Sequence, residues 1–244
     1  MVSGKYSALS GAVAREQAMS NLAANLANVN TTGFKKDRIS FSAMLKGAKQ
    51  TSETQGINYA RIRKIGADFS QGGMQTTGRN LDVAIDGPGF LKVMKNDEIF
   101  YTRAGRLMLD SNGMVKTEDG FTVLGAGDTP LQIDTSLGKD IVIAESGEIA
   151  VNGTLAGSQV QVFSIKDQDK LVKVGHSLYK LAEGDAQPLT DYRVIQGNLE
   201  ASNVNMMEEM TSMIATQRAF EAHTKVIESY SQLSQKQDEL GSIG

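Results

Sequence analysis

The chain is organised around the stretch NLAANLANVNTTGF, residues 21–34. Within it, Leu22, Leu26 and Val29 follow one another at steps of four and three residues, which is the spacing of one helical face. An Asn-Thr-Thr-Gly run comes next, and these residues favour turns because short polar side chains bond the local backbone and glycine accepts a positive φ. The stretch therefore predicts the end of an N-terminal helix and the start of an extended segment.

Four asparagines fall within residues 21–30, which is unusual in a helix because Asn is an indifferent helix former. Any one of them could belong to a polar helix end with a C-cap. For the run as a whole, we favour a helix whose polar face packs against other chains.

Helical periodicity marks both ends of the chain. Residues 3–28 carry two narrow apolar seams with many small residues between them, a pattern that suits bundling with several neighbours. Residues 205–240 carry a longer helical pattern with a methionine-rich seam, and Asn205 with Glu208 forms a capping-box pattern at its start. Phe220 is the largest apolar side chain on that seam, so we expect it at the centre of the contacts that this helix makes.

The middle of the chain differs from its ends. Residues 35–79 carry two basic clusters, residues 35–38 and residues 61–64, on either side of a Gln/Ser/Thr/Gly-rich run. We interpret both clusters as solvated surface rather than anion-binding sites. Between residues 80 and 190, apolar and polar residues alternate in short runs separated by turn pairs such as Asn152-Gly153. This alternation predicts a central antiparallel β domain.

We therefore predict a mixed α and β fold, with a central antiparallel β domain flanked by N- and C-terminal helices that pair as a coiled-coil-like stalk. The predicted divisions are an N-terminal helix and turn at 1–34, an extended connecting arm at 35–79, the central β domain at 80–190, and a C-terminal junction and long helix at 191–244. Within the β domain, we expect Lys173 at a solvent-facing strand position.

The composition excludes several kinds of site. The 244 residues include no cysteine, which rules out disulfides, thiolate metal sites and cysteine nucleophiles. His176 and His223 are the only histidines, and we expect no metal and no cofactor. A net charge of −3 argues against a nucleic-acid-binding protein.

Two further expectations concern membranes and export. No window approaches the ~18–20 apolar residues of a membrane helix, so we expect no membrane insertion. The first ten residues, MVSGKYSALS, contain no continuous apolar segment of the kind found in signal peptides. We therefore expect a protein that stays in the cytoplasm or leaves it without a cleaved signal.

Three local patterns weakly resemble known binding or catalytic motifs. Residues 87–89, Gly-Pro-Gly, lack the third glycine and the helix of a phosphate loop, so they predict a tight turn. Residues 110–113, Asp-Ser-Asn-Gly, lack the later glutamate of a calcium loop and predict a hairpin turn. Asp82 and Asp86 fall ~13 Å apart on one strand face, too far for a paired acid and base, and we place both at a solvated edge. We find no catalytic constellation and predict that the protein is not an enzyme.

Residues 25–35, NLANVNTTGFK, resemble the N-terminal signature of flagellar rod and hook proteins, although the family usually has paired asparagines where this chain has Ala24-Asn25. Further blocks resemble the family at 68–72, 77–78, 81–90, 101–105, 110–113 and 120–125. The most specific match is C-terminal: residues 197–205, Met210, Met213, Ile214, 217–221 and Lys225. Residues 126–190 match less distinctly.

The resemblance implies a structural subunit of the bacterial flagellar basal-body rod, without enzymatic activity or a cofactor. Its terminal helices would form the inner coiled-coil layers and transmit torque, with the β domain outside. Its partners would be copies of itself, other flagellar rod proteins and the flagellar export apparatus, with no nucleic acid and no membrane insertion. It would be exported through the flagellar type III channel without a cleaved signal peptide and reside in the periplasm-spanning rod.

Details within the family narrow the resemblance. Hook proteins usually carry an extra inserted domain, for which 244 residues leave no room. Phe220, the closing Leu240-Gly241 and the opening Gly11-Ala12 resemble a proximal-rod member more than a distal-rod member.

We predict that assembly uses apolar residues of the helix seams and of the N-terminal signature. These are Leu9, Val13, Leu22, Leu26, Val29, Phe34, Met206, Met210, Met213, Phe220, Ile227, Tyr230 and Leu233. Two other classes of function stay open. A secreted enzyme such as a cell-wall hydrolase is disfavoured by the lack of an acid/base pair. A β-domain binding module or adhesin on a helical stalk fits the architecture but leaves the family blocks unexplained.

Overall fold

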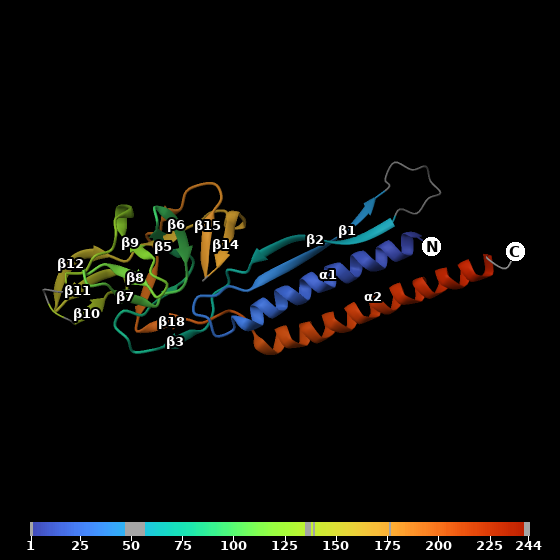
Figure 1. Ribbon diagram of the computed structural model, residues 1–244. Helices are drawn as coiled ribbons and strands as arrows, with labels where there is room; N and C mark the ends of the chain where they lie inside the picture. The colour runs from blue at the N-terminus through green and yellow to red at the C-terminus, as the bar shows by residue number, and fades with distance from the viewer. Residues whose placement is uncertain (1, 47–56, 135–137, 139, 176, 242–244) are drawn as a thin grey trace. The chain divides into compact units, whose positions relative to one another are not determined.

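The computed structural model describes residues 2–46, 57–134, 138, 140–175 and 177–241 (Figure 1). His176, one of the two histidines considered above, lies outside these residues. The chain forms two compact units. The helical unit consists of Met1–Ala27, Asp37–Asp68 and Asn205–Gly244, and the β-rich unit consists of Asn28–Lys36 and Phe69–Val204.

Two helices dominate the helical unit. α1 (Val2–Ala27) and α2 (Met206–Gly241) lie side by side and run antiparallel (Figure 1). Both helices were predicted from periodicity, and both are confirmed. The side chain of Asn205 caps α2, because its Oδ1 accepts a hydrogen bond from the backbone N of Met207 at 3.1 Å.

Small residues on α1 let α2 approach closely. A Cβ added at Gly4 would lie 2.5 Å from the hydroxyl oxygen of Tyr230, and one added at Gly11 would lie 2.5 Å from Cε1 of His223. Ala18, which follows Gly11 by seven residues, is 5% exposed. The buried line of α1 therefore consists of residues with little or no side chain, and this leaves room for the Tyr230 and His223 side chains of α2.

A two-stranded antiparallel sheet completes the helical unit. β1 (Asp37–Lys46) pairs with β2 (Ile57–Ala67) in a register that sets Asp37 opposite Ala67. The segment predicted as an extended connecting arm is thus a paired sheet. The prediction gave more weight to the polar run at residues 47–56 than to the strand-forming residues on both sides of it. Residues 47–56 themselves lie outside the described residues.

The β-rich unit is built from antiparallel sheets, and this confirms the predicted antiparallel β domain. Among the described residues its main sheet has nine strands, of which seven follow the order β14-β15-β6-β5-β9-β8-β7, while β13 pairs with β5 and β16. These strands are β5 (Phe90–Lys95), β6 (Glu98–Thr102), β7 (Leu107–Leu109), β8 (Val115–Thr117), β9 (Thr122–Leu124), β13 (Val162–Ser164), β14 (Leu171–Gly175), β15 (Leu178–Leu181) and β16 (Gln187–Pro188).

Smaller sheets and two short 3₁₀ helices, η1 and η3, complete the unit. The remaining elements are a sheet of β10 (Ile141–Ile143), β11 (Glu148–Val151) and β12 (Thr154–Gln159), a pair of β4 (Val83–Asp86) and β17 (Arg193–Gln196), a pair of β3 (Met74–Thr76) and β18 (Asn198–Glu200), and η1 (Ala126–Asp128) and η3 (Gln168–Lys170). The two pairs join the last strands of the unit to its first strands.

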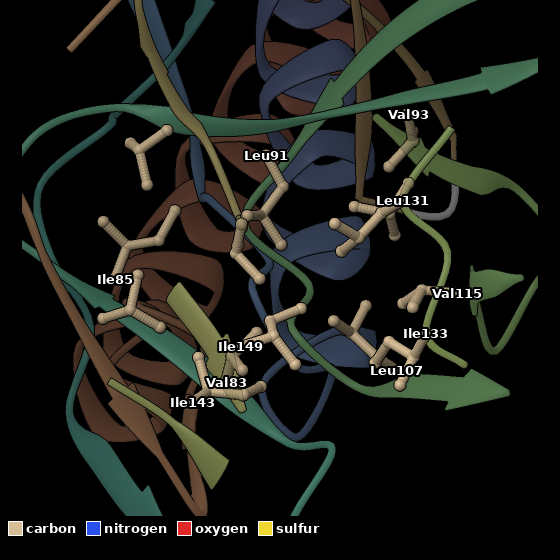
Figure 2. Packing of buried hydrophobic residues seen from close by; sticks show 14 of the residues in the cluster. Val83, Ile85, Leu91, Val93, Leu107, Val115, Leu131, Ile133, Ile143 and Ile149 are labelled. Carbon is tan, nitrogen blue, oxygen red and sulfur yellow. The ribbon is translucent and has the colours of Figure 1, made fainter. Parts of the chain in front are cut away.

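The sheets share one apolar core, part of which Figure 2 shows. Val83 from β4, Leu91 from β5, Val115 from β8 and Ile149 from β11 belong to this core, and each is 1% exposed. Burying a side chain of this kind stabilises a fold by about 1.5–3 kcal/mol. The core therefore holds the separate sheets together as one unit.

The predicted turns are also confirmed. Gly87, between β4 and β5, has φ +104°, a conformation that glycine adopts readily. The backbone N of Gly113 donates to Asp110 O at 2.9 Å in the turn between β7 and β8. Neither pattern is a phosphate or calcium loop in form, because each passes directly from one strand to the next.

Candidate functional site

The N-terminal signature ends in a tight turn within the β-rich unit. Gly33 has φ +66°, and a Cβ at this position would collide with the backbone of Arg103 and Ala104. The backbone N of Gly33 donates to Glu200 O at 2.8 Å. The turn therefore needs glycine both for its conformation and for its close approach to the strands of this unit.

A buried ionic network lies directly beside this turn. Lys35 Nζ donates to Glu200 Oε1 at 2.5 Å, and both side chains are 0% exposed. Arg103, which is 5% exposed, donates from its Nη1 to the other carboxylate oxygen, Glu200 Oε2, at 3.1 Å. One carboxylate thus holds two buried cations. We refer to Lys35, Arg103 and Glu200 as the junction network.

Backbone groups complete the junction network. Ser70 O accepts a second hydrogen bond from Lys35 Nζ at 2.7 Å, and Gly72 N donates to Glu200 Oε1 at 2.9 Å. The Nη2 of Arg103 donates to Gly87 O at 2.8 Å. Because a buried charge that loses its partner costs several kcal/mol, the segments that meet here depend on one another.

Sequence reasoning missed this network and misjudged Lys35. The cluster at residues 35–38 was interpreted as solvated surface, whereas Lys35 is fully buried and pairs with a residue 165 positions away. That separation is beyond the reach of local patterns. The available signal was indirect, since Lys35 and Glu200 each fall in a block that resembles the family.

The prediction for Lys173 was also wrong. It was expected at a solvent-facing strand position, but its Nζ lies 3.8 Å from the centre of the Phe34 ring and donates to Lys35 O at 2.8 Å. The alternation of β14 places Lys173 on the inward face, while Val172 and Val174 are 55% and 57% exposed. Hydrophobicity alone would place Val172 and Val174 on the inward face of β14 and Lys173 on the outward face.

Asn25 makes contacts within its own chain rather than with another. Its side chain is 1% exposed, accepts from Asp37 N at 2.9 Å and donates to Asp37 O at 3.1 Å. Its Nδ2 also donates to Glu209 Oε2 at 3.2 Å, which links α1 to α2 inside the helical unit. The expectation that the asparagine face packs against other chains therefore does not hold for Asn25.

Asp82 and Asp86 have different environments, although both were expected at a solvated edge. Asp82 is 1% exposed, and its Oδ2 accepts from Thr77 Oγ1 at 2.7 Å. Asp86 is 43% exposed at its side chain and lies 3.2 Å from Arg193. Asp82 is thus a buried structural residue of the turn before β4, and only Asp86 fits the expectation.

The predicted assembly residues fall into three groups by exposure in the single chain. The exposed group is Leu9, Val13, Met206, Met210 and Leu233, the half-buried group is Leu22, Leu26, Val29, Met213, Phe220, Ile227 and Tyr230, and the buried residue is Phe34. Phe34 is 5% exposed and packs beneath Lys173, so its ring is a packing residue of the β-rich unit. The role of the other residues stays a prediction.

Within the part of the chain that the structure describes, no group of three or more histidine, aspartate or glutamate side chains is placed to hold a metal ion. The helices of that part also include none that is long and apolar enough to cross a membrane.

Three family models match the chain, and each contains one member of the junction network. "Flagella basal body rod protein" matches residues 6–35, which include Lys35. "Flagellar hook protein FlgE/F/G D1 domain" matches residues 84–151, which include Arg103. "Flagellar basal body rod FlgEFG protein C-terminal" matches residues 195–240, which include Glu200.

Curated relatives match over almost the whole chain. The flagellar basal-body rod protein FlgF of Caulobacter vibrioides is 34% identical over 241 residues, which cover 98% of each chain. The flagellar basal-body rod protein FlgG of Bacillus subtilis is 31% identical over 259 residues, covering 97% of this chain and 98% of the relative. FlgG of Borreliella burgdorferi is 33% identical over 256 residues, covering 93% and 94%.

The fold and the three matched blocks define a class, the structural rod and hook proteins of the bacterial flagellum. The identity over nearly the full length is more specific. The chain belongs to the flagellar basal-body rod protein family, and its role is that of a structural rod subunit.

Proposed function

We propose that the chain assembles with copies of itself and with related rod proteins through the outward faces of its terminal helices, and that the assembled rod transmits torque. The observation that carries this proposal is an exposed apolar stripe on α1. Tyr6, Leu9 and Val13 are 55%, 47% and 44% exposed and recur at i, i+3 and i+7, so they share one helical face. Exposed apolar side chains gathered in this way mark a contact surface for another chain.

The start of α2 offers a second apolar surface. Met207, Met210 and Ile214 are 72%, 44% and 52% exposed at steps of three and four residues. Methionine is flexible and packs against irregular surfaces, which suits a contact that must form in several slightly different settings. We refer to the two groups together as the outer helix stripes.

We further infer that α1 and α2 pair as a coiled-coil-like unit. Three of the contacts across the pair are Gly4 with Tyr230, Gly11 with His223, and Asn25 with Glu209. From Gly4 to Gly11 to Asn25, the residue number on α1 rises by seven and then by fourteen. The partner's residue number on α2 falls by the same amounts. A constant seven-residue repeat is the register of a coiled coil, and it leaves the outer helix stripes free for neighbouring subunits.

Family membership supports the remaining parts of the proposal. We infer that the subunit is not an enzyme, that it resides in the basal-body rod, and that the flagellar export apparatus carries it there without a cleaved signal peptide or membrane insertion. Phe220 and Leu240-Gly241 favour a proximal-rod position. Relatives named FlgF and FlgG both match the chain, so this position is part of the proposal.

Assembly of the purified chain tests the proposal. Leu9→Asp and Val13→Asp each place a charge on the α1 stripe, and we expect either to prevent the formation of sedimenting assemblies. Ser20→Asp is the matched control, because Ser20 is exposed on the same face of α1 but beyond the apolar stripe. Assemblies that form equally well from Leu9→Asp and from Ser20→Asp would contradict the role of the α1 stripe, and an unmodified chain that forms no assemblies would favour a monomeric binding module.

A further inference from the structure

Exposed methionines gather at the start of α2. Met206, Met207 and Met210 are 45%, 72% and 44% exposed and fall within the first five residues of this helix. The other methionines that are exposed in the described part of the chain, Met74 and Met108, lie on β3 and β7 of the β-rich unit. We refer to Met206, Met207 and Met210 as the methionine cluster. The function proposed above uses the apolar character of these side chains but not the chemistry of their sulfur atoms.

Hydrogen bonds at the start of α2 fix the direction in which the cluster points. Asn205 Oδ1 accepts from the backbone N of Met207 at 3.1 Å and caps the first turn. Glu209 is 8% exposed and accepts from Asn25 Nδ2 on α1, so its side of α2 faces α1. Met207 precedes Glu209 by two residues, which is a rotation of roughly 200° about the helix axis. Met207 therefore lies on the side of α2 that points away from α1 and is open to small solutes.

The reactive group of the cluster is the thioether. A peroxide oxidises it by oxygen transfer: a lone pair of the sulfur forms an S–O bond, the O–O bond breaks, and the second oxygen leaves as water. The sulfur loses two electrons and the peroxide gains them. The chain has no cysteine, so no thiol competes for the oxidant. Met207, the most exposed of the described methionines, is therefore the first of them to react.

Oxidation changes the surface that α2 offers to another chain. Methionine sulfoxide is polar, whereas the thioether that it replaces is apolar. Met207 and Met210 belong to the outer helix stripes, and the contact proposed for these stripes is apolar. A sulfoxide oxygen buried in such a contact loses its hydrogen bonds to water and gains none in return. The oxidised start of α2 therefore forms a weaker contact.

We propose that the methionine cluster is a reversible oxidation site, at which a peroxide blocks the assembly of the free subunit and methionine sulfoxide reductases restore it. The inference rests on the proposed function, because the block acts through the contact that the outer helix stripes make. That contact also covers the cluster. Sensitivity to peroxide is thus a property of the free subunit, and assembly removes it.

Hydrogen peroxide added to the purified full-length chain tests the inference. Mass spectrometry of proteolytic peptides measures the sulfoxide fraction at each methionine, and sedimentation measures assembly. Oxidation of the cluster is expected to lower the sedimenting fraction about tenfold, since apolar contacts are lost. The two methionine sulfoxide reductases, one for each epimer, are expected to restore it. Undiminished assembly of a chain with a fully oxidised cluster would overturn the inference, and so would a loss that persists after the cluster has been reduced again.

Leucine variants separate the cluster from the other methionines, because leucine has a similar volume and no sulfur. The triple variant Met206→Leu/Met207→Leu/Met210→Leu is compared with its own untreated sample. Peroxide is expected to lower its assembly less than about twofold, since no thioether is left in the cluster. Met108→Leu is the matched control, because Met108 is 43% exposed but lies on β7. Its assembly should fall as much as that of the unsubstituted chain, and equal losses in the two variants would overturn the assignment of the cluster.

Protection on assembly is a test that needs no substitution. Met207 is expected to be oxidised about tenfold more slowly when the peroxide is added after assembly, because the contact covers its side chain. Equal rates at Met207 in free and assembled protein would overturn the inference and leave the proposed function to the variants of the α1 stripe. An untreated chain that forms no assemblies would contradict the proposed function and, with it, this inference.

Discussion

Glu200 and Lys35 form a 2.5 Å ion pair in which neither side chain is exposed. Lys35 closes the N-terminal block of the family, and Glu200 lies in the C-terminal block. The guanidinium of Arg103, from the middle block, donates to the second carboxylate oxygen. A single carboxylate therefore connects all three sequence blocks that the family shares.

Replacing Glu200 tests this arrangement. Glu200→Gln keeps the shape of the side chain but leaves two buried cations without a counter-charge, so we expect a loss of about 3–5 kcal/mol in the free energy of unfolding of the β-rich unit. Urea unfolding followed by tyrosine fluorescence measures it. The control is Glu118→Gln, which removes an exposed partner of Arg106 and should cost at most about 1 kcal/mol. Equal losses in the two variants would show that the junction network does not stabilise the fold.

Gly11 tests the close approach of α1 and α2. In an isolated helix, Gly→Ala stabilises by about 1 kcal/mol. In this chain we expect the opposite sign for Gly11→Ala, because the new Cβ would lie 2.5 Å from His223 Cε1. Adding His223→Ala, which removes the ring, should restore the lost helicity. Circular dichroism during thermal unfolding measures both effects, and Gly73→Ala, which meets no atom within 4 Å, is the control. A gain in helical stability from Gly11→Ala alone would contradict the pairing.

A variant of Phe220 tests whether the helical unit serves assembly independently of the stability of the β-rich unit. It is half-buried on α2, and truncation of a buried phenylalanine costs about 3–5 kcal/mol. We expect Phe220→Ala to leave the calorimetric unfolding of the β-rich unit nearly unchanged while blocking rod assembly and swimming. The control is Gln232→Ala, an exposed change on the same helix. Normal swimming of Phe220→Ala cells, together with early melting of the β-rich unit, would contradict this prediction.

Alkaline pH tests the burial of Tyr192. Burial raises the pKa of Tyr192, and its hydroxyl donates to the backbone between β10 and β13, for example to Ser146 O at 2.9 Å. Because the folded-state pKa lies above the unfolded value of about 10, this contribution to stability is complete below that value and is lost as the pH rises through the folded-state pKa. Ultraviolet titration of tyrosinate should show a late component that Tyr192→Phe reduces, because burial also raises the pKa of Tyr101, which contributes the remainder. A late component of unchanged size in the variant would contradict the prediction.

The comparison of sequence and structure shows where local patterns suffice. The 3.6-residue period placed α1 and α2, and the alternation with turn pairs placed the strands around the core, because both signals lie within a few neighbouring residues. Residues 35–79 were predicted as an extended connecting arm, and within them β1 and β2 pair along their length. Its polar middle obscured the strand-forming residues on both sides.

The junction network could not be derived in this way. A lysine beside a turn is solvated in most proteins, and only a partner distant in sequence makes its burial favourable. Lys173 was misplaced for a related reason, since its stem covers the Phe34 ring while two valines of β14 face outward. The predicted assembly residues also depend on contacts between chains, which no pattern within one chain specifies.

The most direct test of the central claim is hydroxyl-radical footprinting of the outer helix stripes in isolated and assembled protein. Tyr6, Leu9, Val13 and Met207 are all at least 44% exposed in the single chain and should be modified readily there. Assembly through the terminal helices predicts a strong and simultaneous drop in the modification of all four side chains. Unchanged modification of these side chains in assembled rods would contradict the account.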